Sequence, residues 1–167
     1  MKTQNNTMKK IRIGQGYDIH QLAENQPFWL GGLQIPHTHG AVGHSDADVL
    51  IHAICDALLG ALALRDIGFH FPNKDPQYQG IDSKKLLEKV VTMLHQKGYQ
   101  IGNVDAMVCL EAPKINPYIP EMQKILANIM QIAPEDVSIK ATTSEKLGFV
   151  GRGEGITATA VALIFQM

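Results

Sequence analysis

The chain has 167 residues, of which 45% are hydrophobic and 19% are charged, and this balance predicts one domain with a buried core. Its formal net charge of −1 excludes a broad basic surface for nucleic acid, and no stretch approaches the roughly 20 apolar residues of a membrane span. Residues 1–10 contain no apolar segment typical of a signal peptide, so we expect a disordered leader and a cytoplasmic protein.

The N-terminal part of the chain predicts two strands followed by a loop. Residues 11–19 alternate in polarity and include β-branched side chains, as in a strand. Residues 28–36 predict a second strand that is broken at Gly31 and Gly32, which indicates a hairpin. Residues 37–46 predict a loop.

A helix and a long loop are expected next. Residues 47–64 carry apolar side chains at helical spacing, with Asp46 as the expected N-cap and Asp48 in the first turn. Cys55 in this helix and Cys109 further on both lie in apolar runs, which predicts buried, reduced thiols. Residues 65–81 are rich in Gly, Pro, Asn and Asp, and predict a surface loop of the kind that often carries function.

In the remaining chain, strands alternate with helices. The predicted helices cover residues 83–97, capped by Asp82, and residues 121–132, opened by Pro120; the predicted strands cover residues 101–110, 137–142 and 156–165. The resulting fold class is α+β: one domain, with a mixed β-sheet and helices packed on one face.

Asp18, His20 and His52 predict a metal site. Residues i and i+2 of a strand point to the same side, and a carboxylate with two imidazoles suits zinc with an open fourth position. Asp48 and Asp56 lie four residues before and after His52, and either can accept the remaining imidazole hydrogen. Spacing alone leaves open the alternative of ordinary structural histidines.

Two loops offer groups for a phosphorylated ligand. Residues 140–146, KATTSEK, combine hydroxyls that suit phosphate with a carboxylate that suits Mg²⁺, although a solvated turn is the alternative. The loop at Ala112-Pro113-Lys114 has exposed amides that could read a base edge, or is an ordinary loop. His44-Ser45-Asp46 is adjacent in sequence, so it is no catalytic triad, and a helix start that faces an anion is the better interpretation.

Five segments, taken in order, resemble one family: GYDIH, GHSDADVLIHAICDALLGA, DIGFHFP, EAPK and KATTSEKLGFVGRGEG. This is the 2-C-methyl-D-erythritol 2,4-cyclodiphosphate synthase family, and the resemblance runs from Ile11 to Phe165 within a predicted domain over residues 11–167. It implies a homotrimer around a threefold axis with its sites at subunit interfaces. It also implies the conversion of a cytidine diphosphate substrate into a cyclic diphosphate with release of CMP, with no nucleic acid or membrane partner.

The resemblance also assigns roles to residues. Asp18, His20 and His52 match the ligands of one zinc ion per subunit, and Glu145 matches a ligand of the Mg²⁺ or Mn²⁺ that is bound with the substrate diphosphate. The residues implied to be catalytic are His44, Asp56 and Thr143. Those implied to bind substrate are Ser45 for the 2-phosphate, Asp66, Ile67 and Gly68 for the methylerythritol, Ala112, Pro113, Lys114, Ala141, Thr142 and Thr143 for the cytidine diphosphate, and Phe149 and Arg152 at an axial cavity for an isoprenoid diphosphate.

Two other functions stay open on the sequence. A zinc phosphohydrolase would use the same ligands, and a trimeric isoprenoid-diphosphate sensor would have lost catalysis and, with it, the metal ligands. The sequence departs from the family pattern at Asn73 and Lys74, in the loop that covers the substrate in the family.

Overall fold

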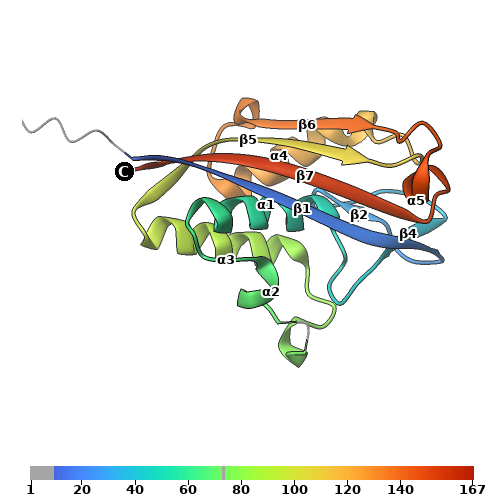
Figure 1. The fold of residues 1–167 in the computed structure, drawn as a ribbon, viewed down its shortest axis with the longest axis horizontal. Coiled ribbons are helices and arrows are strands. Elements are labelled where there is room, and N and C mark those ends of the chain that lie inside the picture. Colours follow the sequence, from blue (N-terminus) through green and yellow to red (C-terminus); the bar gives the residue numbers. More distant parts are fainter. Residues whose placement is uncertain (1–9, 73) are drawn as a thin grey trace, which may run out of the picture.

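A computed structural model describes residues 10–72 and 74–167, so the predicted leader, except for Lys10, and Asn73 lie outside the described residues (Figure 1). The strands are β1 (Ile11–Glu24), β2 (Trp29–Leu30), β3 (Leu33–Gln34), β4 (His39–Val42), β5 (Tyr99–Cys109), β6 (Val137–Thr142) and β7 (Gly155–Gln166). The helices are α1 (Val49–Ala61), α2 (Ile67–His70), α3 (Ser83–Gln96), α4 (Ile119–Met130) and α5 (Gly148–Gly151).

The main sheet is mixed, as predicted, and has the strand order β4-β1-β7-β5-β6. β5 and β6 are parallel, and the other neighbouring pairs are antiparallel. β1 pairs with β7 from Ile11 opposite Phe165 to Gln21 opposite Gly155, so the two longest strands form the centre of the sheet. β2 and β3 form a separate hairpin around Gly31 and Gly32, which confirms the predicted turn.

The helices cover one face of the sheet, as predicted (Figure 1). α1 lies directly on β1 and β7, and α3 packs against α1 on the side away from the sheet. Nearly all residues of α1 are therefore buried. The closest approach is at Gly14 and Gly16 of β1, where an added Cβ would overlap the backbone of α1. This contact fixes how α1 sits on the strand that carries Asp18.

Pairing between distant segments extends one predicted strand and forms another that was not predicted. β1 continues five residues beyond the predicted end because Gln21 to Glu24 pair with β4. β4 itself lies within the predicted loop over residues 37–46. The β4 sequence, His-Gly-Ala-Val, has little intrinsic strand preference, and its partner is too far along the chain for a local pattern to reveal the pairing.

The structure also corrects the predicted cap of α1 and the predicted loop over residues 65–81. α1 is capped by Asp48 and not by the predicted Asp46, because the Asp48 carboxylate accepts a hydrogen bond from the Ile51 amide at 3.0 Å. The predicted loop over residues 65–81 contains α2 and a 3-10 turn at Pro76–Tyr78, each started by an aspartate cap. A short element of this kind has too few residues to show periodicity.

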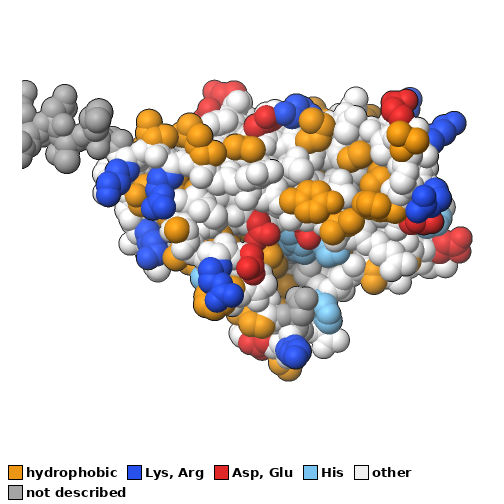
Figure 2. Space-filling model, in the orientation of Figure 1, with side chains coloured by type: hydrophobic (Ala, Val, Ile, Leu, Met, Phe, Trp, Pro, Cys, Tyr) orange, Lys and Arg blue, Asp and Glu red, His pale blue; other side chains and the backbone are white. Residues whose placement is uncertain are grey.

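The face of the sheet opposite the helices is apolar and exposed. Ile13 and Ile19 of β1 are 68% and 46% exposed, and Val161 of β7 is 44% exposed. Figure 2 shows hydrophobic side chains gathered across this face. Cys109, at the end of β5, is free and half-buried rather than buried as predicted, whereas Cys55 is free and buried. Among the described residues, we find no helix of the length and apolar character that crossing a membrane requires.

Candidate active site

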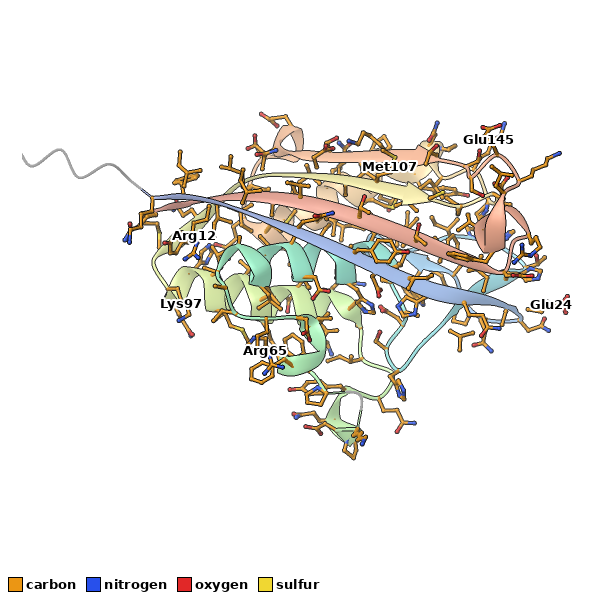
Figure 3. All side chains as sticks on the ribbon, viewed as in Figure 1. Arg12, Glu24, Arg65, Lys97, Met107 and Glu145 are labelled. Carbon is orange, nitrogen blue, oxygen red and sulfur yellow. The ribbon has the colours of Figure 1, made fainter. Side chains whose placement is uncertain are left out.

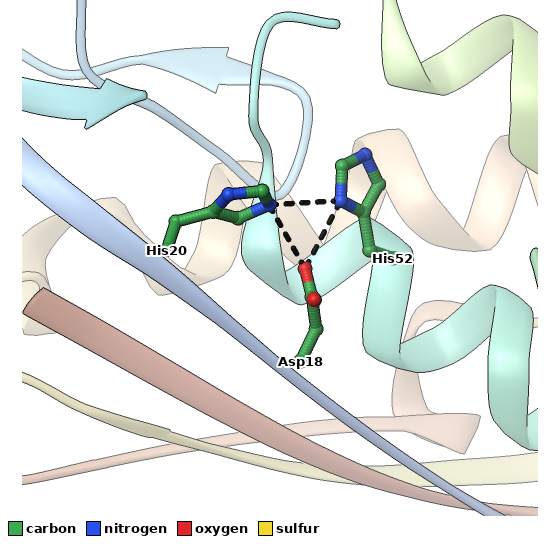
Figure 4. Close-up of side chains that lie close together, drawn as sticks. All are labelled: Asp18, His20 and His52. Atoms are coloured by element: carbon green, nitrogen blue, oxygen red, sulfur yellow. Dashed lines mark hydrogen bonds and ion pairs between the residues drawn. The ribbon is translucent and has the colours of Figure 1, made fainter. Parts of the chain in front are cut away.

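Asp18, His20 and His52 meet in one cluster, as the sequence predicted (Figure 4). Asp18 and His20 project from the same side of β1, and His52 projects from the first half of α1. The Asp18 Oδ2 atom lies 3.0 Å from His20 Nε2 and 3.0 Å from His52 Nδ1. The two nitrogens are 3.1 Å apart.

The size and chemistry of this triangle fit a zinc ion. Ligand atoms of a tetrahedral zinc with bonds of about 2.0–2.1 Å lie about 3.3 Å apart, close to the observed spacings. His20 Nδ1 lies 3.0 Å from the carbonyl oxygen of Val42. Because a carbonyl can only accept, Nδ1 carries the hydrogen and Nε2 presents its lone pair to the cluster. A lone pair that faces a carboxylate and a second imidazole in this way suits a cation bound between the three groups.

The electrostatics of the cluster also favour a bound cation. Partial burial raises the pKa of Asp18, but hydrogen bonds and charge from His20 and His52 lower it by more, so the carboxyl group is ionised well below its usual range. Burial lowers the pKa of His20, but the Asp18 carboxylate raises it by more. Asp18 therefore supplies a negative charge that both imidazoles face.

A cavity of about 340 Å³ opens beside the cluster. Its lining brings together seven of the predicted residues, which come from three separate motifs of the sequence: Asp18, His20, His44, Ser45, His52, Ile67 and Gly68. Apolar side chains complete the wall, among them Phe71, Tyr78 and Leu86. A cavity with one metal-binding corner and a partly apolar wall suits a small ligand with a carbon skeleton and an anionic group.

Asp56 and Asp66 hold α2 at the edge of this cavity. The Asp66 carboxylate caps α2 by accepting from the Phe69 amide at 2.9 Å. The Asp56 carboxylate accepts from the Ile67 amide at 2.7 Å. Burial raises the pKa of Asp56. Both aspartates thereby position Ile67 and Gly68 next to the metal cluster.

The predicted partner of His52 was wrong. In the described structure, neither Asp48 nor Asp56 is hydrogen-bonded to the His52 ring; Asp48 is fully buried and binds the amides of Ile51 and Gly32. His52 Nε2 instead lies 2.9 Å from Ser83 Oγ and 3.2 Å from Ser45 Oγ. Sequence reasoning missed Ser83, because its place after Asp82 marked it only as the start of a helix.

A second cavity, of about 250 Å³, contains the other group of predicted residues. It is lined by Pro113, Lys114, Ala141, Thr142 and Thr143, from the loop after β5 and the end of β6. Ala112 lines a neighbouring cavity together with Arg152. Glu145 lies beside this second cavity on the loop after β6 (Figure 3), where its carboxylate accepts from Thr143 Oγ1 at 3.2 Å.

The two cavities are separated within one chain. The register of the sheet places Asp18 level with Ala158, Val108 and Ala141 on successive strands. Three strand spacings of about 4.8 Å put the β1 and β6 backbones about 14 Å apart. The metal cluster and Glu145 therefore do not lie in one compact site within a single chain.

Glu111 anchors the loop that carries Glu145. One oxygen of the Glu111 carboxylate accepts from the Ser144 amide at 3.0 Å, the Ser144 hydroxyl at 3.1 Å and the Lys146 amide at 3.2 Å. Loss of solvent raises the pKa of Glu111, but these hydrogen bonds lower it by more. The carboxylate thus holds the residues on both sides of Glu145.

Replacement of Glu111 by alanine should release this loop. The substitution removes three hydrogen bonds without touching the metal cluster. If Glu145 binds Mg²⁺, as the family resemblance implies, we expect a rise of about tenfold in the Mg²⁺ concentration required for half-maximal turnover and an unchanged metal content at the cluster. A titration of activity against Mg²⁺ measures this. Glu135→Ala, at an exposed carboxylate elsewhere, is the control. An unchanged Mg²⁺ requirement in Glu111→Ala would show that the loop is ordered without this anchor.

Phe149 and Arg152 lie on and just after α5. Phe149 is 38% exposed and lines a shallow cavity with Ile19 and Gly155. The Arg152 guanidinium forms two hydrogen bonds of 2.9 Å with the Glu154 carboxylate. Neither Phe149 nor Arg152 lines the cavity of the metal cluster, although His20 borders both that cavity and the one of Phe149.

The order of these motifs and their geometry agree with the comparisons with known proteins. The model of the YgbB family matches residues 11–165. The chain belongs to the YgbB family. A relative from Porphyromonas gingivalis, named 2-C-methyl-D-erythritol 2,4-cyclodiphosphate synthase, is 60% identical over 156 residues, which are 93% of this chain and 96% of the relative.

Solved structures of similar proteins have the same fold as this YgbB-family chain. A structure of IspF from Plasmodium falciparum in complex with CDP has a TM-score of 0.82 and 36% identity, over 93% of this chain and 96% of that chain. A bifunctional IspDF from Campylobacter jejuni has a TM-score of 0.91 and 36% identity over 95% of this chain, which spans 43% of that longer protein. The predicted domain boundary at residue 11 remains a prediction, although the family match starts there.

Proposed function

We propose that this enzyme converts 4-diphosphocytidyl-2-C-methyl-D-erythritol 2-phosphate into 2-C-methyl-D-erythritol 2,4-cyclodiphosphate and CMP, a step of non-mevalonate isoprenoid biosynthesis. The observation that carries the proposal is the cavity that joins the Asp18, His20 and His52 cluster to His44, Ser45, Ile67 and Gly68. Membership of the YgbB family and the 60% identical synthase support it.

The proposed reaction needs no nucleophile from the protein. An oxygen of the substrate's 2-phosphate attacks the β-phosphorus, and the bond between that phosphorus and the oxygen bridging to the α-phosphate breaks, so CMP leaves with the electron pair. The obstacle is repulsion between anionic phosphates. Alignment of the two ends of one substrate makes ring closure effectively unimolecular, which accounts for a site without an activated serine, cysteine or lysine.

Each group of residues has a role in this proposal. A zinc ion at Asp18, His20 and His52 and a Mg²⁺ or Mn²⁺ at Glu145 would neutralise phosphate charge. His44 and Ser45 bind the 2-phosphate, and Asp66, Ile67 and Gly68 bind the methylerythritol, with Asp56 fixing the Ile67 amide. The cytidine diphosphate is bound by the residues of the second cavity and its border: Ala112, Pro113, Lys114, Ala141, Thr142 and Thr143.

The same proposal includes a homotrimer with its sites at subunit interfaces. Two observations support it: the apolar outer face of the sheet is exposed, and β1 and β6, which border the two cavities that one substrate must bridge, lie about 14 Å apart in one chain. A neighbouring subunit can bring its second cavity to the first. On the family resemblance we further propose an isoprenoid diphosphate near Phe149 and Arg152, and a cytoplasmic location.

A charge placed on the apolar face should break the trimer. Val161 is 44% exposed at the centre of this face, so Val161→Asp would bury a carboxylate in the interface at a cost of several kcal/mol. We expect a folded monomer with at least about a hundredfold less activity. Light scattering after size-exclusion chromatography measures the mass. Thr92→Asp, at an exposed position of α3, should remain a trimer, and a trimeric Val161→Asp would place the interface elsewhere.

Glu145→Gln tests the proposed Mg²⁺ ligand independently of the proposed zinc site. The substitution keeps the shape of the side chain but removes its charge, so we expect a rise of about ten- to a hundredfold in the Mg²⁺ requirement and no loss of zinc. The measurement combines an activity titration with metal analysis of the purified protein. If the magnesium requirement stays as in the unsubstituted enzyme, Glu145 is not a ligand.

Mass analysis of the products tests the proposed function directly. The cytidine diphosphate substrate is incubated with the enzyme, with and without Mg²⁺ and a chelator. We expect the cyclic diphosphate and an equal amount of CMP, both lost on chelation. Linear phosphate products would indicate the phosphohydrolase, and intact substrate would indicate the sensor; the presence of Asp18, His20 and His52 in one cluster argues against the sensor.

A further inference from the structure

Ser83 occupies a position that none of the predicted roles explains. It is the first residue of α3 and is completely buried. Its hydroxyl lies 2.9 Å from His52 Nε2 and makes a short contact with the Asp46 carboxylate. Ser83 is absent from the lining of the cavity, so it can influence a ligand only through these neighbours.

The direction of each hydrogen bond follows from what each group can do. The Asp46 carboxylate can only accept, so the single hydrogen of the Ser83 hydroxyl is donated to Asp46. Ser83 Oγ must then accept from His52 Nε2. The Ser45 hydroxyl is a poorer alternative for the Ser83 hydrogen, because it lies 3.5 Å away.

This arrangement determines the tautomer of His52. A neutral imidazole has one hydrogen, and placing it on Nε2 leaves the lone pair on Nδ1. Nδ1 is the atom that lies 3.0 Å from Asp18 Oδ2 and 3.1 Å from His20 Nε2. The lone pair therefore points to the centre of the proposed metal site. His20 obtains the corresponding arrangement from the Val42 carbonyl.

Asp46 is itself firmly held. Its carboxylate accepts from the Ser83 amide at 3.0 Å as well as from the Ser83 hydroxyl, and its own amide donates to the Ile81 carbonyl at 3.1 Å. The Asp48 amide, at the cap of α1, also donates to it at 3.3 Å. Asp46 thus links the start of α3 to the start of α1, and the start of α1 lies about one turn before His52.

We infer that Ser83, held by Asp46, is a positioning residue that fixes the tautomer and ring orientation of His52 for metal binding. This inference rests on the proposed zinc centre. Ser83 contributes no ligand atom; it ensures that His52 presents Nδ1 to the metal without first exchanging its proton. Groups that orient a metal-bound histidine in this way typically change metal affinity or activity by about 10- to 100-fold.

Ser83→Ala tests the inference, with Thr92→Ala as the matched loss of a hydroxyl from α3. Among the described residues, Thr92 Oγ1 binds only the Glu88 carbonyl of its own helix, two turns or more from Ser83. We expect Ser83→Ala to bind zinc about tenfold more weakly in competition with a chelator, since Ser45 can partly replace the lost acceptor. The kcat of Ser83→Ala should fall with little change in KM. Ser83→Thr should restore the zinc affinity and kcat to within about threefold. Thr92→Ala should match the unsubstituted protein.

Nitrogen-15 NMR of labelled histidines supplies a readout that a general loss of packing would not move. In the zinc-loaded protein, His52 should carry its hydrogen on Nε2, and this hydrogen should exchange faster with solvent in Ser83→Ala. If Ser83→Ala does not fold, Asp46→Asn and Ser83→Thr are compared in the same way. Unchanged zinc affinity together with unchanged exchange in the folded variants would overturn the inference.

His52→Ala in the same chelator assay distinguishes a failure of the proposed zinc centre from a failure of the inference about Ser83. If His52→Ala keeps the zinc affinity of the unsubstituted protein, the proposed zinc centre fails and the role of Ser83 fails with it. If His52→Ala loses zinc but Ser83→Ala does not, the zinc centre stands and the inference about Ser83 alone is overturned.

Discussion

His52→Ala should leave the fold intact and remove zinc binding. Zinc sites with four protein ligands are worth about 10–16 kcal/mol, or about 3–4 kcal/mol for each ligand, so the loss of one of the three ligands here should weaken zinc affinity by about 10²–10³-fold. Turnover should fall at least as far. The helix should persist because Asp48 caps α1 and alanine has a higher helix propensity than histidine. Metal analysis and circular dichroism measure the two effects.

His95→Ala is the matched control for His52→Ala. His95 lies in the last turn of α3 and outside the cavity of the metal cluster, so its loss should change neither zinc content nor turnover. Near-normal turnover of His52→Ala in metal-depleted buffer would remove the zinc ion from the proposed mechanism.

Gly16→Ala should destabilise the protein and weaken the metal site together. A Cβ on Gly16 would overlap the Ala53 carbonyl oxygen, and a backbone atom inside a packed helix cannot move aside as a flexible side chain would. We expect a loss of about 3 kcal/mol or more and a melting temperature lower by about 6–12 °C. Displacement of β1 from α1 should also separate Asp18 from His52 and weaken zinc binding.

Gly60→Ala is a control that should raise the melting temperature, whereas Gly16→Ala should lower it. Gly60 lies in α1, and a Cβ there would meet only the Gln15 carbonyl oxygen, at an ordinary 3.7 Å. Alanine favours a helix over glycine by at most about 1 kcal/mol, and Gly60 lies in the last turn of α1, so this variant should melt up to about 2–4 °C higher. Calorimetry measures the melting temperatures of both variants. Equal stability of Gly16→Ala and the unsubstituted protein would mean that β1 and α1 are not in fixed contact.

The sequence predicted the metal cluster from local spacing for Asp18 and His20 and from the family resemblance for His52, which lies 34 positions from Asp18. The spacing of Asp18 and His20 places both side chains on one side of a strand wherever that strand lies. His52 was recognisable as a polar residue in an otherwise apolar helix. The α3 cap at Asp82 and the exact extent of β6 at residues 137–142 were likewise determined by neighbouring residues.

Contacts between distant segments were not predictable in this way. β4 has a weak strand sequence and exists because Gln21 to Glu24 are available as partners. Asp46 and Asp48 are equivalent as caps in the sequence, and only the position of α3 assigns Asp46 to Ser83 and leaves Asp48 to cap α1. The partner of His52 was mispredicted for the same reason.

The sequence by itself determined the fold class, the three residues of the metal cluster and the family. These depend on periodicity, on the spacing of adjacent side chains and on the order of motifs. Only the tertiary structure decided that Ser83 binds His52, that Glu111 holds the loop of Glu145, and that two strands separate the two cavities. The physical reason is that each of these contacts joins residues more than 30 positions apart, whose approach depends on the packing of the whole sheet and its helices.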